Sequence, residues 1–391
     1  MIRSFALRAL VFFLPLVVYL ASSTGVVVYS GELMPLRDVA VLQTGAAPVL
    51  YGRAYRVNFF AFKLIATQIR KPQVLMLGSS HVMQFRSQFL NKQSAAFYNG
   101  GGAIHNLSEI HEFLYHLDGS RMPQVLMLGL DAAWYNTTGI DGFSERTVGD
   151  PVDDESWPPT YRLMNLSKEA FGDVLSGKIR LGQVLAKTEP IHGVQAIGLN
   201  AIVNGVGFRN DGSVQSGTSI LHHPTAQEVE QDGLKLMSVN MNYYSRGDHV
   251  VESRLNETEN LLRYAKDRNI FVIAFSPPFA PSLYAHMMVD GGYQYLPELA
   301  LRLKALFEQY HFAYFDFSNA AALGATDDEM IDEGHASELL SLKMYIRMLE
   351  DLPEVLGKYS DLTYLQQVLE QPGLDRFDLF ADYLSAKQEA K

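Results

Sequence analysis

Residues 71–90 read KPQVLMLGSSHVMQFRSQFL, which indicates a strand, a sharp turn and a helix in succession. The run Val74–Leu77 is apolar throughout, as in a parallel strand that is buried on both faces. The tripeptide Gly78–Ser80 then interrupts the apolar pattern and predicts a tight turn. Apolar residues recur among polar ones over 82–90, so we predict a helix there.

Ser80 is therefore expected at or beside the N-terminus of a helix. Backbone N–H groups point outward at such a position and favour developing negative charge, which suits a nucleophile. A serine pair after a strand also commonly caps the next helix and does nothing more. The turn alone leaves both interpretations open.

The composition restricts the class of protein. The chain has 391 residues, of which 48% are hydrophobic and 19% charged, so it can bury one large core or two ordinary ones. Its net charge of −11 and lack of a basic run argue against a nucleic-acid partner. The absence of cysteine excludes a disulfide scaffold, a thiol nucleophile and a cysteine-based zinc site. Any catalysis would use oxygen or nitrogen groups, and we predict no metal and no cofactor.

The N-terminus carries an apolar run behind a positive flank. Arg3 and Arg8 precede the run from Ala9 to Tyr29, and about 20 such residues span a bilayer as a helix. We predict an uncleaved, single-pass transmembrane anchor over 1–31, with a cleavable signal peptide as the alternative. Either way the positive flank stays inside, and the chain after Glu32 is expected outside the cytoplasm, in the periplasm or on the outer face of the cell membrane.

Strands and helices alternate after a tether at 32–70, whose aromatic residues suit contact with either the membrane or the domain. Such alternation predicts an α/β fold with a parallel sheet covered by helices on both sides. The predicted strands are 73–77, 95–98, 124–128, 270–275 and 313–317. The predicted helices, besides 82–90, are 106–117, 251–267, 296–309, 336–350 and 361–371.

The pattern dissolves over 132–250 into loops and short helices. An insertion of this length can form a cap over a binding site, in which case loops such as 203–220 contribute to substrate affinity more than to stability. A surface subdomain without a role in binding is the alternative.

Polar or glycine residues follow three of the predicted strands, at the sheet edge where ligands of open α/β sheets bind. Besides Ser80, these are Gly101 and Gly102 after the second strand and Asp131 after the third. Glycine lets the backbone approach a ligand and direct an N–H at it, although a simple turn explains the glycines equally well. A capping role is the alternative for Asp131.

A carboxylate and a histidine lie three residues apart just before a helix near the C-terminus. In the sequence Asp332-Glu333-Gly334-His335, the aspartate can bond the Nδ1–H of the imidazole. The Nε2 atom can then take a proton from a serine hydroxyl, so Ser80, His335 and Asp332 could form a catalytic triad.

The order and placement of these residues resemble the SGNH (GDSL-like) hydrolase and acyltransferase superfamily. The resemblance covers about 71–135 and 250–350, and implies a three-layer, flavodoxin-like domain over 71–391 with the insertion at 132–250. It implies that Ser80 is the nucleophile, that Gly101 or Gly102 is the oxyanion glycine, and that Asp332 and His335 complete the catalytic set. The Gly-Ser-Ser form and the predicted anchor are similar to the cell-envelope branch, which includes teichoic-acid D-alanyl transfer and polysaccharide O-acetylation proteins.

Asp131 departs from the pattern of the superfamily, which has an asparagine there. An ionised carboxylate cannot donate a hydrogen bond to an oxyanion and would repel it. The oxyanion hole would then depend on the N–H groups of Ser80 and the glycines, or Asp131 is protonated, or its side chain has turned elsewhere.

Three functions remain open. The leading one is an exported, membrane-anchored serine esterase or O-acyltransferase that acts on a cell-envelope polysaccharide through an acyl-serine. The resemblance implies a polytopic membrane-bound O-acyltransferase as its partner. The second is a non-catalytic glycan-binding or assembly subunit of such a complex. The third is a serine hydrolase directed at lipid or peptide.

Overall fold

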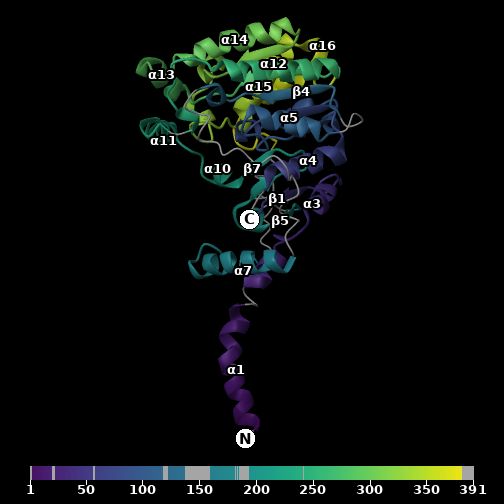
Figure 1. Cartoon of the computed structure of the whole chain (residues 1–391), viewed down its shortest axis with the longest axis vertical. Helices are drawn as coiled ribbons and strands as arrows, with labels where there is room; N and C mark the ends of the chain where they lie inside the picture. The colour runs from purple at the N-terminus through teal and green to yellow at the C-terminus, as the bar shows by residue number, and fades with distance from the viewer. Residues whose placement is uncertain are drawn as a thin grey trace.

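A computed structural model of the chain describes residues 2–19, 23–55, 58–117, 122–136, 159–180, 182, 184, 193–240 and 242–380. Figure 1 shows helix α1 (Ile2–Tyr19) extending away from the rest of the chain, with the sheets and their covering helices beyond its C-terminal end.

The main sheet has five strands in the order β3-β2-β4-β8-β9, and every neighbouring pair is parallel. Its strands are β2 (Val74–Leu77), β3 (Phe97–Asn99), β4 (Val125–Gly129), β8 (Phe271–Ser276) and β9 (Ala313–Asp316). The predicted α/β fold with a parallel sheet is therefore confirmed. When the five strands are renumbered 1 to 5 in chain order, their order across the sheet is 2-1-3-4-5. The topological switch point therefore falls between β2 and β4.

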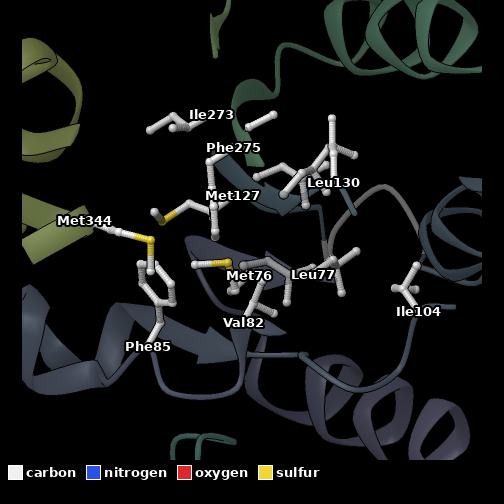
Figure 2. Close-up of a cluster of buried hydrophobic side chains, with 14 of the residues drawn as sticks. Met76, Leu77, Val82, Phe85, Ile104, Met127, Leu130, Ile273, Phe275 and Met344 are labelled. Carbon is white, nitrogen blue, oxygen red and sulfur yellow. The ribbon is translucent and has the colours of Figure 1, made fainter. Parts of the chain in front are cut away.

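The central strands are buried on both faces, because helices cover both sides of the sheet. Every residue of β2 and β4 is buried. Helices α5 (Leu107–Tyr115), α12 (Glu252–Asp267) and α14 (Tyr295–Gln309) supply the successive crossovers, and α12 contacts both of the others. The last long helix, α15 (Glu338–Asp351), brings Met344 to the cluster that includes Phe85 and Met127 (Figure 2).

The predicted helix over 82–90 was wrong. This stretch forms two short 3₁₀ turns, η2 (Ser80–Val82) and η3 (Ser87–Leu90), and a third, η4 (Ser94–Ala96), precedes β3. The reason is that tertiary hydrogen bonds take the groups an α-helix would use. The Met83 carbonyl accepts from the N–H of Val214 at 2.9 Å, and the N–H of Ser87 donates to Asp211 at 2.8 Å.

The Asn99 side chain also binds backbone carbonyls that an α-helix would use. Its Nδ2 donates to the carbonyls of Val82 and Phe85, at 2.8 and 2.9 Å. Val82, Phe85 and Leu90 of this stretch are still buried, but local periodicity cannot reveal which backbone groups distant residues will bind.

A second sheet joins the start of the chain to the insertion. Its order is β5-β1-β6-β7, with β1 (Val49–Tyr51) parallel to β5 (Gln195–Ile197) and antiparallel to β6 (Val206–Phe208). Strand β7 (Val214–Ser216) pairs with β6. The region 203–220 therefore holds two paired strands rather than a plain loop.

Segment 32–70 lies against the domain. Helix α4 (Phe59–Arg70) buries Phe60 and Phe62, and Tyr51 of β1 is also fully buried. The Nζ of Lys63 is buried among the same elements, donates to the Asn99 carbonyl at 2.9 Å and lies 3.8 Å from the Phe208 ring centroid.

The insertion leaves and rejoins the main domain at one point. Asn136 and Val250 form an antiparallel bridge, and the Val251 N–H donates to the Tyr135 carbonyl at 2.8 Å. Residues 137–158 of the insertion lie outside the described residues.

The remaining described helices are α2 (Gly25–Tyr29), α3 (Leu36–Leu42), α7 (Pro159–Leu175), α9 (Leu199–Asn204), α10 (Gly217–Leu221), α11 (Ala226–Ser238), α13 (Pro281–Asp290), α16 (Pro353–Leu356) and α17 (Leu362–Leu369). The further 3₁₀ turns are η6 (Ala132–Tyr135), η7 (Asn242–Tyr244), η8 (Ala320–Leu323) and η9 (Asp327–Glu329).

Among the described residues, no helix has the length and apolar character needed to cross a membrane. The predicted transmembrane anchor over 1–31 is therefore not supported by the structure, in which this region is divided into α1 and α2.

Candidate active site

Ser80 lies on the turn that follows β2, at the sheet's switch point. Gly78 allows this turn to pack closely, because a Cβ there would meet Val82 at 2.9 Å and the Gly129 carbonyl at 3.2 Å. The preceding serine, Ser79, is the capping residue, with its hydroxyl accepting from the N–H of His81 at 3.2 Å. The two serines thus have different positions, and the hydroxyl of Ser80 is directed at a different partner.

That partner is His335. The Oγ of Ser80 lies 2.7 Å from the Nε2 of His335, although 255 residues separate them in the chain. The Nδ1 of His335 lies 2.7 and 2.8 Å from the two carboxylate oxygens of Asp332. A carboxylate at Nδ1 holds the proton on that nitrogen, which leaves Nε2 to accept from the serine hydroxyl.

The loop that carries His335 is held by its own backbone. Asp332 accepts from the N–H of Gly334 at 3.0 Å and from that of His335 at 2.8 Å. The Ile331 N–H donates to the His335 carbonyl at 2.7 Å. These bonds fix the imidazole without help from substrate. About a third of the His335 side chain, 32%, remains exposed, so a substrate can reach it.

The electrostatics of the pair favour an ionised aspartate. Burial raises the pKa of Asp332, but the bonds from the His335 ring and from two backbone N–H groups outweigh this and lower the pKa to about 2. Burial lowers the pKa of His335, but the bond to Asp332 and the charges of Asp332, Glu333 and Asp131 raise it above its ordinary value. His335 is therefore a stronger base than a free imidazole.

The glycines after β3 serve the packing of the nucleophile turn. The Gly101 N–H donates to the Asn99 side chain at 2.7 Å, and the Gly102 N–H donates to the carbonyls of Gly78 and Ser79 at 3.0 and 2.9 Å. Gly102 has a φ of 81°, and a Cβ there would lie 2.1 Å from the Cε of Met83. In this structure both N–H groups are thus already bonded within the protein.

Asp131 has turned toward His81, which is one of the three arrangements that its sequence position left open. It is 3% exposed, and its Oδ1 lies 2.8 Å from the Nδ1 of His81. It makes no side-chain capping bond to the 3₁₀ turn that follows it. The Asp131 carboxylate is therefore paired with His81, the residue that follows the candidate nucleophile.

Two tyrosines of the insertion lie beside His81 and the His335 loop. The Tyr243 ring lies edge-on to His81, with centroids 4.6 Å apart, and the Tyr244 hydroxyl donates to Glu333 at 3.2 Å. Burial, and next the charge of Asp131, raise the pKa of Tyr243, so its phenol stays neutral. Sequence reasoning missed both tyrosines, because no periodic pattern marks them and their contacts are to residues far along the chain.

A buried ion-pair network supports the two halves of the site. Glu338, three residues after His335, begins α15 and is completely buried. Its Oε1 lies 2.6 Å from Arg86, which follows the nucleophile turn, and 2.9 Å from Arg209 of the insertion. Its Oε2 accepts from the Leu379 N–H at 3.1 Å. The network joins the Ser80 turn, the His335 loop and the second sheet.

Within the described residues, no group of three or more histidine, aspartate or glutamate side chains is arranged to hold a metal ion. No known family model matches the chain, and a search of curated proteins finds no match.

Proposed function

We propose that the protein is a serine esterase or O-acyltransferase that works through an acyl-Ser80 intermediate. The observation that carries this proposal is the continuous hydrogen-bonded arrangement of Ser80, His335 and Asp332. The Ser80–His335 contact joins residues on two separate loops, and the His335–Asp332 contact orients the imidazole within its own loop, as expected for a nucleophile and its base.

The proposed reaction has two halves. The Nε2 of His335 takes the proton of Ser80 as Oγ attacks the ester carbonyl, and the imidazolium then protonates the departing alkoxide. The acyl group is left on Ser80. In the second half His335 takes a proton from water or a sugar hydroxyl, whose oxygen attacks the acyl-serine and releases Ser80 with its proton restored. Asp332 orients the ring and stabilises the imidazolium in both halves.

Stabilisation of the oxyanion limits the rate in this proposal. The Ser80 N–H begins η2, where no preceding helical turn supplies an acceptor. The N–H groups of Gly101 and Gly102 would have to exchange their internal bonds before they could contribute. Each missing donor typically costs about 100- to 1000-fold in rate, so we expect slow turnover unless substrate rearranges the glycine turn.

The substrate and location rest on the resemblance to the cell-envelope branch of the SGNH superfamily. We propose a cell-envelope polysaccharide as acyl acceptor or ester substrate, and a polytopic membrane-bound O-acyltransferase as partner, with the domain outside the cytoplasm. Attachment of α1 to a membrane is supported by its exposed apolar side chains, such as Phe12 at 77% and Val11 at 60% exposure. Alkaline carbonate extraction of cell membranes tests the attachment: the protein should stay in the pellet.

A non-catalytic subunit is the second candidate, and specific contacts favour it. Asp131 takes the place of an oxyanion donor, and the glycine N–H groups are engaged. A protein that only binds a glycan or its partner needs no free oxyanion donors. Turnover of an aryl acetate by the purified full chain separates the two: an esterase gives a stoichiometric burst followed by slow turnover, and a binding subunit gives neither. With a glycan oligomer present, the ratio of acetylated glycan to free acetate then distinguishes transfer from hydrolysis.

A further inference from the structure

A second aspartate–histidine pair lies directly beside the first. His81 follows Ser80 in the chain, and its Nδ1 is 2.8 Å from Asp131, at the end of β4. Both side chains are buried, at 7% and 2% exposure. The triad makes no use of this pair, and a buried histidine and aspartate next to a nucleophile are costly to keep without a purpose.

The two imidazoles are in contact. The ring centroids of His81 and His335 are 4.7 Å apart, with an angle of 41° between the ring planes. Gly334 makes the contact possible, because a Cβ there would lie 3.1 Å from the Nε2 of His81 and 2.7 Å from the Tyr244 hydroxyl. The Nε2 of His81 thus lies beside Gly334 of the His335 loop, and of the two histidines it is His335 that accepts the hydrogen bond from the Ser80 hydroxyl.

His81 is enclosed on its remaining sides. Tyr243 packs edge-on against it, and the Ser79 hydroxyl lies 3.2 Å from its Nδ1. The Nδ1 proton is directed to Asp131, whose carboxylate is the nearer and the charged acceptor. The ring has little freedom to turn, because Ser79 of the turn after β2, Asp131 after β4, Tyr243 of η7 and His335 itself enclose it.

We propose that His81 and Asp131 are positioning residues for His335: the His81 ring holds the His335 imidazole against Ser80, and the negative charge of Asp131 stabilises its imidazolium form. This inference rests on the proposed function and deepens it. It also gives Asp131 a role that an asparagine could not fill, since the charge is what acts. Substitution by asparagine is therefore expected to slow the reaction rather than restore an oxyanion donor.

The charged and titratable groups around His335 come from four parts of the chain. Asp332 and Glu333 lie on its own loop, Asp131 follows β4, and His81 is on η2. The Tyr244 hydroxyl of η7 is bonded to Glu333. The carboxylate of Asp131 is among the charges that raise the pKa of His335. A negative charge favours the protonated form, so its removal must lower the pKa of His335.

The test compares variants that separate charge from shape. Asp131→Asn keeps an acceptor for His81 and removes the charge, whereas Asp131→Glu keeps the charge and alters the shape. Asp290→Asn removes a carboxylate from an exposed ion pair with Arg246 and serves as the matched control. The full chain, labelled with ¹³C-histidine, is titrated by NMR, with the His335 signal assigned by its loss in His335→Gln. Labelling of Ser80 by a fluorophosphonate is measured over the same pH range.

We expect the His335 titration in Asp131→Asn to move down by about half to one pH unit, with the acid limb of labelling moving equally. The rate on the alkaline plateau should fall about two- to five-fold. Asp131→Glu and Asp290→Asn should titrate as the wild type does. An unmoved titration in Asp131→Asn, or one that moves equally in Asp290→Asn, overturns the inference. A shifted titration in a protein that no fluorophosphonate labels leaves the positioning role intact and refutes the proposed function instead.

Discussion

Arg86 and Glu338 form an ion pair 2.6 Å long in which the two side chains are 1% and 0% exposed. Arg86 follows the nucleophile turn, and Glu338 follows His335 by three residues, so the pair links the two loops of the candidate triad directly. A buried carboxylate shared by two arginines is sensitive to loss of its charge, because the cations that remain cannot be hydrated.

Glu338→Gln is accordingly expected to lower the free energy of unfolding by about 3–5 kcal/mol. Urea denaturation of the full chain measures this. Asp351→Asn is the control on the same helix, since its bond to Arg347 is exposed and should contribute at most about 1 kcal/mol. Equal losses in the two variants would show that the buried network does not join the loops.

Gly102 should tolerate alanine poorly, for two separable reasons. Its positive φ strains any other residue by about 1–2 kcal/mol, and the added Cβ would push aside the terminal methyl of the flexible Met83 side chain, at a smaller additional cost. Gly291 has a similar φ of 78° with nothing within 4 Å of a Cβ, so Gly291→Ala reports the strain alone. We expect Gly102→Ala to unfold at lower urea and to slow fluorophosphonate labelling, because Met83 packs behind the Ser80 turn. Identical unfolding of the two variants would contradict this packing.

The pH dependence of the reaction follows from the raised pKa of His335. The imidazole must be neutral to act as a base, so the labelling rate should rise with pH through that pKa, above the ordinary value near 6.5. Asp332→Asn removes the strongest stabilisation of the imidazolium and should move this limb to lower pH while reducing the plateau. A limb that stays in place would exclude His335 as the base.

The stability of the fold should depend on Asp332 at low pH. Its folded pKa of about 2 lies below the unfolded value near 3.9, so its contribution is complete above that value and is lost as the pH falls toward 2. As the pH is lowered from 5 to 2, the unfolding temperature of the wild type should therefore fall more steeply than that of Asp332→Asn. Parallel curves would indicate that the ion pair with His335 is absent.

The parts of the fold that sequence could predict are those with a strong local pattern. The strands at Val74–Leu77 and Val125–Gly129 are apolar on both faces, and the structure has strands there. The 3₁₀ turns at 80–90 could not be predicted, because Asp211 and Asn99 compete for their backbone groups. The second sheet was missed because its strands have three residues each, and because β1 pairs with β5 and β6 across more than a hundred positions.

In the candidate site, too, some features could be predicted from the sequence and others could not. Residue type and spacing identified Ser80, Asp332 and His335, and the structure brings their side chains within hydrogen-bonding distance. The contact of His81 with His335 depends on the absence of a side chain at Gly334, and on tyrosines that the insertion contributes. Both features bring together residues that are far apart in the chain, so the sequence could not reveal the contact between His81 and His335.

Activation of Ser80 by His335 is measured by mass spectrometry of the full chain after treatment with a fluorophosphonate. We expect one adduct, mapped to the peptide that contains Ser80, which is lost in Ser80→Ala and strongly reduced in His335→Ala. The matched control, Ser79→Ala, should keep the adduct, because the Ser79 hydroxyl accepts from the His81 N–H, whereas the Ser80 hydroxyl is the one bonded to His335. A folded wild type without an adduct, or an adduct that persists in Ser80→Ala, would contradict the role of Ser80 as the nucleophile.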